Sequence, residues 1–153
     1  AIILCAQRII AETGIVMSQF RSADAFASWI GLVPQCNESA GKKKNTRIRK
    51  GNKFLKSTLV ECARASIRHK ESFYYAKYCK IAARRGGKRS LVAVAHTMAL
   101  AIFHILSKKQ HFCDLGSTFF DTINAEKVLK RNLLSLQRLG FSATLTPLPS
   151  STA

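Results

Sequence analysis

Apolar residues recur along the chain at helical spacing, and glycines and serines interrupt them. Residues 2–13 are apolar on nearly all sides, and Gly14 follows as a natural helix stop. Ser22 can cap a second short helix that Gly31 ends. A proline at position 34 then favours extended backbone, so a loop is predicted between this helix and the next.

Further helices are predicted over residues 52–69, 72–85, 91–106 and 125–139, with a mixed connector over 107–124. The helix over 91–106 is apolar nearly all round, which is typical of a central buried helix. The helix over 52–69 has one apolar side, formed by Phe54, Leu55, Leu59, Cys62, Ala63 and Ala65. The pattern predicts an all-α fold with a basic loop between the second and third helices.

The length of 153 residues suits a single core. We predict one helical domain over residues 1–140 and a tail over 141–153, whose first residues could form a short strand. Because the chain begins inside an apolar helical pattern without Met or a capping residue, we expect it to be truncated at its N-terminus.

The charge of the chain says more about its partners than its hydrophobicity does. The formal net charge is +17, yet 47% of the residues are hydrophobic, so the chain is predicted to be folded and to attract polyanions. Nucleic acid is the first partner to consider, and an anionic membrane surface is the second. The longest apolar run has only 16 residues and contains His96 and His104, so we expect no membrane span and a cytoplasmic, nucleoid-associated location.

Cysteine usage is unremarkable for a reducing compartment. The five cysteines are widely spaced, and no C-x-x-C pair occurs. The sequence therefore predicts free thiols rather than disulfides or a zinc site.

A cationic strip follows Glu38 and Ser39, and no Asp or Glu occurs again before Glu61. Lysine and arginine side chains contact phosphates and release counterions when they bind nucleic acid. The alternative is a solvated surface run or a localisation tag. We favour nucleic-acid contacts, because basic helix faces continue the strip, and assign them to Lys42, Lys43, Lys44, Arg47, Arg49, Lys50, Lys53 and Lys56.

Ser39 is the candidate nucleophile, in a small-residue turn that ends at Gly41. A serine hydroxyl attacks phosphorus only when a group accepts its proton and cations stabilise the developing charge. The neighbouring lysines could supply that charge. From spacing alone, however, an ordinary loop serine is the default interpretation.

Structural interpretations are favoured for the remaining candidates. Tyrosines at helical spacing could stack on bases, but core packing is the better interpretation of Tyr74, Tyr75 and Tyr78. The two histidines of 91–106 are interpreted as core or groove residues. The scattered carboxylates Asp114, Asp121 and Glu126 do not form a metal motif, so no metal site is predicted.

The segments AFASWIGLVPQCNESAGKKKN and RKGNKFLKSTLVECARASIR resemble the IS110/IS116/IS902 insertion-sequence transposases. Further matching segments are CAQRIIAETG, AARRGGKRSLVAVAH, DLGSTFF and LGFSATLTP, so the resemblance covers nearly the whole chain. Its most specific part combines Trp29, Gly31, Leu32 and Pro34 with the Ser39 segment and with Lys50-Gly51-Asn52.

The resemblance implies the C-terminal domain of a two-part DNA transposase. In that family an N-terminal RuvC-like domain carries DEDD acids that hold Mg²⁺, and the C-terminal domain supplies a serine nucleophile. By position, the nucleophile is Ser39. The resemblance also implies DNA as substrate, a guide RNA from the element and a homo-oligomer for the full-length protein.

Two departures limit this assignment. The family serine is often followed directly by glycine, whereas Ala40 precedes Gly41 here. The RuvC-like acids are not in this chain, so we expect no cofactor in the chain itself, Mg²⁺ in the RuvC-like domain, and an isolated chain that binds nucleic acid without completing transposition. The alternatives are a non-catalytic nucleic-acid-binding module and, more weakly, an interaction domain for an acidic partner.

Overall fold

The computed structural model describes residues 2–35, 37–39, 42–45 and 47–144, with the side chains of Ile2, of both strands and of Glu126 left undescribed. The chain forms two compact units, Ala1–Ser117 and Thr118–Ala153. The domain predicted over 1–140 is therefore divided, and its last helix belongs to the second unit.

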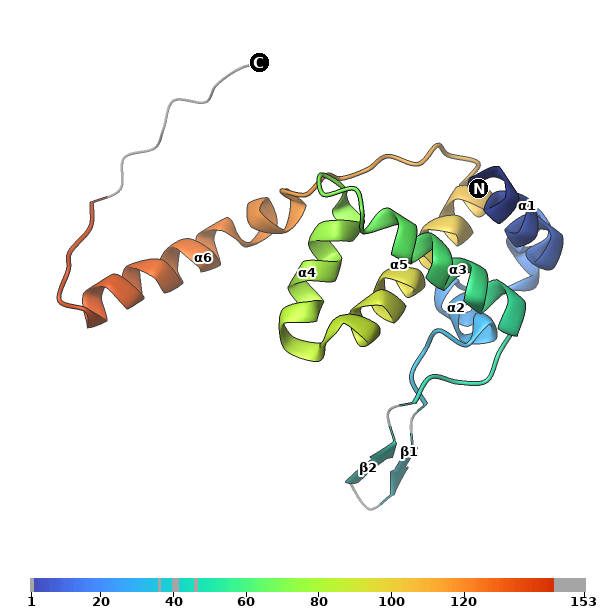
Figure 1. Ribbon diagram of the computed structural model, residues 1–153, viewed down its shortest axis with the longest axis horizontal. Helices are drawn as coiled ribbons and strands as arrows, with labels where there is room; N and C mark the ends of the chain where they lie inside the picture. Colours follow the sequence, from blue (N-terminus) through green and yellow to red (C-terminus); the bar gives the residue numbers. More distant parts are fainter. Residues whose placement is uncertain (1, 36, 40–41, 46, 145–153) are drawn as a thin grey trace. The chain divides into compact units, whose positions relative to one another are not determined.

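The first unit is helical apart from one hairpin, which bears out the all-α fold class. Its helices are α1 (Ile2–Thr13), η1 (Met17–Gln19), α2 (Ala23–Ile30), α3 (Lys53–Ser66), α4 (Phe73–Arg85) and α5 (Gly87–Lys108). The strands β1 (Asn37–Ser39) and β2 (Lys42–Asn45) form the hairpin between α2 and α3 (Figure 1).

The predicted helix starts are confirmed where a side chain caps them. Ser22, Asn52 and Ser72 each accept a hydrogen bond from a backbone N–H in the first turn of α2, α3 and α4. At the other end of α2, Gly31 adopts a left-handed conformation with φ 85°, which glycine tolerates without a Cβ clash.

The core is built around α5, which contacts α2, α3 and α4. Small residues let the neighbouring helices approach α5 closely, and Ala95 and Ala99 are fully buried. The largest buried side chains around them come from α2, α3 and α5 and are Phe26, Ile30, Leu55, Leu59 and Val94. The segment predicted as the central helix is therefore central, although several of its side chains are only partly buried.

The apolar run of 16 residues predicted no membrane span, but α5 has 22 residues and by length and composition alone could cross a membrane. The same apolar composition is what a core helix needs when three other helices contact it. Four residues of α5, Ser90, Val94, Ala95 and Ala99, are buried, so packing accounts for part of its hydropathy.

Two residues of the apolar side predicted for α3, Phe54 and Ala65, are exposed. Phe54 is 74% exposed, whereas Leu55 and Leu59 on the same helix are buried. Phe54 lies beside Leu55 in the first turn of α3 but about 100° away round the helix axis, so it points away from the neighbours that cover Leu55. The buried side of α3 is therefore narrower than its helical spacing predicted.

The second unit contains α6 (Phe119–Arg138), which starts six residues before the predicted 125. The first turn carries Phe119 and Phe120, whose rings meet edge to face with centroids 5.4 Å apart. The amphipathic stripe on which the prediction was based begins only at Val128, so the predicted start was too late. Residues 141–144 form no strand, and residues 145–153 of the predicted tail lie outside the described part of the chain.

Candidate nucleic-acid interface

The predicted basic loop is a two-stranded antiparallel hairpin. β1 and β2 pair Glu38 with Lys43 and Ser39 with Lys42, with an irregularity next to Asn37. Ser39 therefore lies in a strand rather than in a turn, and Ala40 and Gly41 lie outside the described residues. Sequence reasoning missed the strands because Asn, Glu and Lys have low β-propensity.

Pairing between the two arms that lead to the strands explains the hairpin. Gln35 N–H donates to the Arg47 carbonyl over 2.8 Å, and Arg49 N–H donates to the Val33 carbonyl over 3.0 Å. Pro34 and Ile48 lie opposite each other in the same ladder. The arms thus supply the extended register that the polar strands continue (Figure 1).

Two glycines cross at the base of the hairpin. A Cβ added to Gly31 would lie 2.7 Å from the Arg49 carbonyl oxygen, and one added to Gly51 would lie 2.5 Å from backbone atoms of Ile30 and Gly31. Only residues without a Cβ allow the end of α2 to pass the segment before α3 so closely. The Gly31 and Gly51 motif residues therefore have a structural role at the crossing.

Polar contacts fasten the crossing to the helices. Asn52 N–H donates to the Trp29 carbonyl, and the Asn52 side chain both caps α3 and donates to Glu12 of α1 over 2.6 Å. The Lys56 ammonium donates to the Arg49 carbonyl over 3.2 Å. These contacts orient the hairpin relative to α1, α2 and α3.

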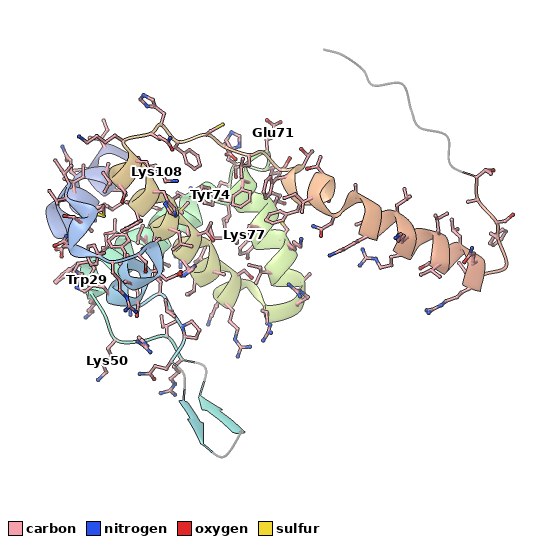
Figure 2. All side chains as sticks on the ribbon, turned by 180° about the vertical axis from the view of Figure 1, so that it is seen from behind. Trp29, Lys50, Glu71, Tyr74, Lys77 and Lys108 are labelled. Carbon is pink, nitrogen blue, oxygen red and sulfur yellow. The ribbon has the colours of Figure 1, made fainter. Side chains whose placement is uncertain are left out.

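The predicted phosphate contacts fall into two groups. Arg47, Arg49, Lys50 and Lys53 are exposed and Lys56 is half-buried, all beside the hairpin base. Lys50 projects from the segment that joins the hairpin to α3 (Figure 2). For Ser39 and for Lys42, Lys43 and Lys44, the structure describes the strand backbone and not the side chains.

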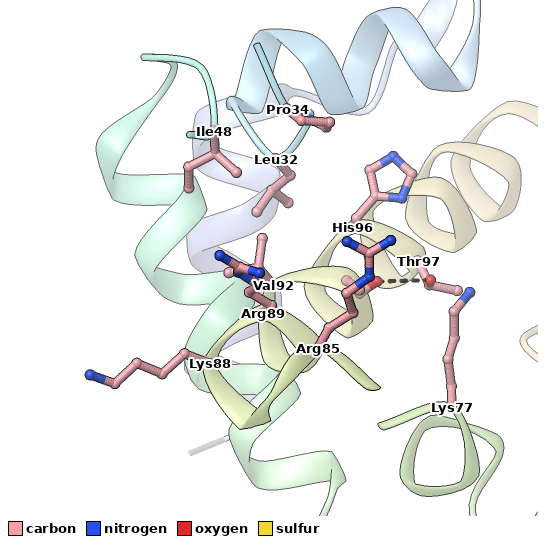
Figure 3. Close-up of a pocket in the computed structure, with 11 residues that line it drawn as sticks. Leu32, Pro34, Ile48, Lys77, Arg85, Lys88, Arg89, Val92, His96 and Thr97 are labelled. Atoms are coloured by element: carbon pink, nitrogen blue, oxygen red, sulfur yellow. Dashed lines mark hydrogen bonds between the residues drawn. The ribbon is translucent and has the colours of Figure 1, made fainter. Parts of the chain in front are cut away.

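A groove of about 650 Å³ opens beside the hairpin base, and we call it the corner groove (Figure 3). Its apolar wall comes from the hairpin arms and α5, through Leu32, Pro34, Ile48, Val92 and Ala93. Its polar residues come from α4 and α5 and are Lys77, Arg85, Lys88, Arg89, His96 and Thr97. No Asp or Glu is among these lining residues.

Sequence reasoning did not identify the corner groove. The run Arg84-Arg85-Gly86-Gly87-Lys88-Arg89 is visibly basic, and it could have been singled out as a second cationic cluster. The apolar wall could not be predicted, because Pro34 and Ile48 reach the groove only through the arm pairing.

Burial changes the charge balance inside the groove. Burial lowers the pKa of Lys77, whose ammonium lies 5.7 Å from the centre of the Phe73 ring. Burial and the nearby Lys77 charge lower the pKa of His96, and Asp24 opposes them. At neutral pH His96 is therefore mostly uncharged, and the two lysines and two arginines supply the positive charge of the groove.

Two of the three tyrosines and one of the three carboxylates make contacts within the fold. Tyr74 and Tyr78 pack against the core, and the Tyr74 ring stacks on Phe112 with centroids 5.9 Å apart. Asp114 accepts hydrogen bonds from Phe73 N–H and Gly116 N–H. In the ranges that the structure describes, no three His, Cys, Asp or Glu side chains gather, so no set there fits Mg²⁺.

Comparison with known proteins points to one family. Residues 3–78, about half of the chain and including the hairpin and its base, match the transposase IS116/IS110/IS902 family. The chain is 32% identical over 113 residues to the "Transposase for insertion sequence element IS1111A" of Coxiella burnetii, a match that covers 71% of this chain and 31% of that protein. No solved structure matches the chain significantly.

A second relative is the "Probable family 20 transposase" of Pseudomonas aeruginosa, 39% identical over 51 residues. That match covers 33% of this chain and 15% of the relative, so the chain spans less than a third of either curated protein. The range that the family model matches includes the glycine crossing and the hairpin. The chain belongs to the IS116/IS110/IS902 transposase family.

Proposed function

We propose that this chain is the C-terminal part of an insertion-sequence transposase, which binds DNA through the hairpin and supplies Ser39 as nucleophile. One observation carries the proposal: the β1–β2 register pairs Ser39 with Lys42, at the start of the run of three lysines. A residue with a hydroxyl is thereby held across the ribbon from a cationic strand. This arrangement suits a phosphodiester better than a core contact.

The proposed step is a phosphoryl transfer to serine. The Ser39 oxygen forms a bond to phosphorus, one phosphodiester P–O bond breaks, and a deoxyribose hydroxyl leaves. The proton from Ser39 passes to a base, and the leaving oxygen takes up a proton. A strand hydroxyl that attacks the phosphoserine regenerates Ser39 and joins the DNA. Lysines and arginines along the ribbon stabilise the charge on the phosphoryl oxygens.

Positioning rests on the hairpin base. The Gly31–Gly51 crossing and the Asn52 contacts hold the arms against α1, α2 and α3. A rigid base lets the ribbon present its paired residues in one orientation, which lowers the entropic cost of aligning a nucleophile with its target.

The chain by itself is proposed to bind nucleic acid without completing strand exchange. Among the described residues no cluster of acids fits Mg²⁺, and we propose that the metal is held outside this chain. The RuvC-like domain implied by the resemblance is the proposed source. A guide RNA, a homo-oligomer and a cytoplasmic, nucleoid-associated location stay predictions.

The nucleophile is tested by trapping a covalent adduct. The chain is mixed with a RuvC-like domain in trans, Mg²⁺, guide RNA and cognate DNA, and protein–DNA adducts are resolved on a denaturing gel. Ser39→Ala should abolish the adduct, whereas Ser57→Ala, at an exposed serine of α3, should retain it. An adduct that persists in Ser39→Ala would show that another residue is the nucleophile.

DNA binding is tested separately by its salt dependence. Replacing Lys42, Lys43 and Lys44 by alanine should reduce the slope of log K against log salt by about 3 on duplex DNA. A charge-matched control replaces Lys127, Lys130 and Arg131, which are exposed on α6. Equal slopes of log K against log salt for both variants would show that the hairpin lysines do not contact the DNA.

A non-catalytic nucleic-acid-binding module is the second candidate. It is favoured by the exposed basic residues beside the hairpin base, Arg47, Arg49 and Lys50, which can contact phosphates without a nucleophile. It predicts salt-dependent binding without an adduct under any of the conditions above.

A further inference from the structure

The corner groove is a second cationic surface, separate from the strands of the hairpin. Arg85 ends α4, and Lys88 and Arg89 begin α5, so the turn between these helices concentrates three charges. In Figure 3 the Arg85 side chain points toward His96, and Lys88 extends outward from the groove. All three side chains are exposed, which makes them available to a ligand.

These charges lack a carboxylate in the groove lining. Like charges held close together repel one another, and an anion placed between them removes that repulsion. Arginine is suited to phosphate, because its planar guanidinium can donate two parallel hydrogen bonds. The cationic side of the groove therefore fits a ligand that carries several phosphates.

The other side of the groove is apolar. Leu32 is buried, Pro34 is exposed, and 37% of Ile48 is accessible. A DNA duplex turns phosphates and sugars outward, and an apolar wall would desolvate those groups without compensation. Unpaired nucleotides expose the faces of their bases, which can lie on apolar side chains while their phosphates meet cations.

The groove is continuous with the hairpin. Pro34 and Ile48 line the groove and also pair with each other in the arm ladder. A DNA strand that contacts the hairpin can thus extend along the hairpin arms to the α4–α5 turn. The groove volume of about 650 Å³ limits the occupant to a few groups rather than the full width of a duplex.

We propose that the corner groove binds an unpaired segment of DNA, with bases on the Pro34–Ile48 wall and phosphates on Arg85, Lys88 and Arg89. The proposal rests on the proposed function, since it assigns the groove to the same DNA that contacts the hairpin. It adds a preference for single-stranded over duplex DNA, which the hairpin charges alone do not provide.

The test measures anisotropy of a labelled single-stranded dT probe about 16 nucleotides long and of a duplex of equal length, at several salt concentrations. The groove variant is Arg85→Ala/Lys88→Ala/Arg89→Ala, which lowers the net charge from +17 by three to +14. The control is Lys127→Ala/Lys130→Ala/Arg131→Ala, which lowers it equally.

The groove variant should lose affinity for the single-stranded probe on the order of tenfold or more, and its salt slope should fall by about 2. The control should change both quantities far less, and duplex binding should be affected less than single-strand binding. Ile48→Thr keeps the β-branched side chain but removes apolar surface. It should weaken single-strand binding without changing the salt slope.

Equal losses in the groove and control variants would overturn the proposal, because net charge would then explain them. Equal losses on single-stranded and duplex DNA would overturn it too. A loss confined to an rU probe would assign the groove to RNA and refute the DNA assignment.

Failure of the proposed function looks different. If the Lys42/Lys43/Lys44 variant weakens duplex binding while the groove variant binds the single-stranded probe normally, only the groove proposal fails. If the unaltered chain binds neither probe in a salt-dependent way, the proposed function fails, and the groove proposal fails with it.

Discussion

Gly51→Ala is the most informative single perturbation of the hairpin base. An added Cβ would lie 2.5 Å from Gly31 N and from the carbonyl carbon and oxygen of Ile30. All three are backbone atoms, so no side-chain rotation relieves the clash. Either α2 or the segment before α3 must move, and the Asn52 contacts that fasten the crossing must move with it.

The expected change in the free energy of unfolding follows from two opposing effects. Inserting a methyl group into a tightly packed site costs about 3 kcal/mol at the upper end of the usual range. Replacing glycine by alanine returns about 1 kcal/mol, because it restricts the unfolded chain. The expected loss in the free energy of unfolding is therefore about 2 kcal/mol. With a urea m-value of about 2 kcal/mol/M, the midpoint should fall by about 1 M.

Gly87→Ala is the matched control. Its added Cβ would meet only the Tyr78 hydroxyl, at 2.9 Å, at the far end of a side chain that can shift. In urea denaturation followed by circular dichroism, this variant should stay within about 0.5 kcal/mol of the unaltered chain. A Gly51→Ala midpoint as high as that of Gly87→Ala would refute the close crossing.

Three further predictions concern the cap, the core and the groove. Asn52→Ala should lower the free energy of unfolding by about 1 kcal/mol in urea denaturation, because α3 loses its N-cap; an unchanged midpoint would contradict that role. Leu59→Ala should cost about 2–5 kcal/mol, since Leu59 is 1% exposed, whereas Phe54→Ala should cost under about 0.5 kcal/mol; similar losses would contradict the burial pattern. Burial holds the pKa of folded His96 below its ordinary 6.5. The contribution of neutral His96 to the free energy of unfolding is therefore fully present above pH 6.5 and is lost as pH falls through the folded pKa. His96→Gln should make the decline in unfolding free energy below pH 6.5 shallower, and an identical pH profile would contradict this.

Local signals were sufficient where one residue type decides a conformation. Ser22, Asn52 and Ser72 cap helices because a side-chain oxygen can reach a backbone N–H within one turn. Gly31 ends α2 for a similarly local reason. These effects involve only neighbours in the chain, so the sequence alone predicts them.

The hairpin is different, because its strands have little intrinsic preference for extended structure. Lys42 to Asn45 pair with Asn37 to Ser39 as a continuation of the arm ladder, whose two arms lie on either side of the polar segment. Phe54 was misassigned for a related reason. Helical spacing defines a side of α3, but only the placement of the neighbouring elements decides which part of that side they cover.

The sequence by itself determined the all-α class, the cap at Ser22 and the stop at Gly31, the strong positive charge and, through its motifs, the family. These properties depend on residue type and short spacing. Tertiary structure alone placed Gly31 against Gly51, paired Ser39 with Lys42, and brought Pro34 and Ile48 to the basic α4–α5 turn. The physical reason is that the crossing and the groove join segments distant in sequence, and backbone packing at one glycine pair decides where they meet.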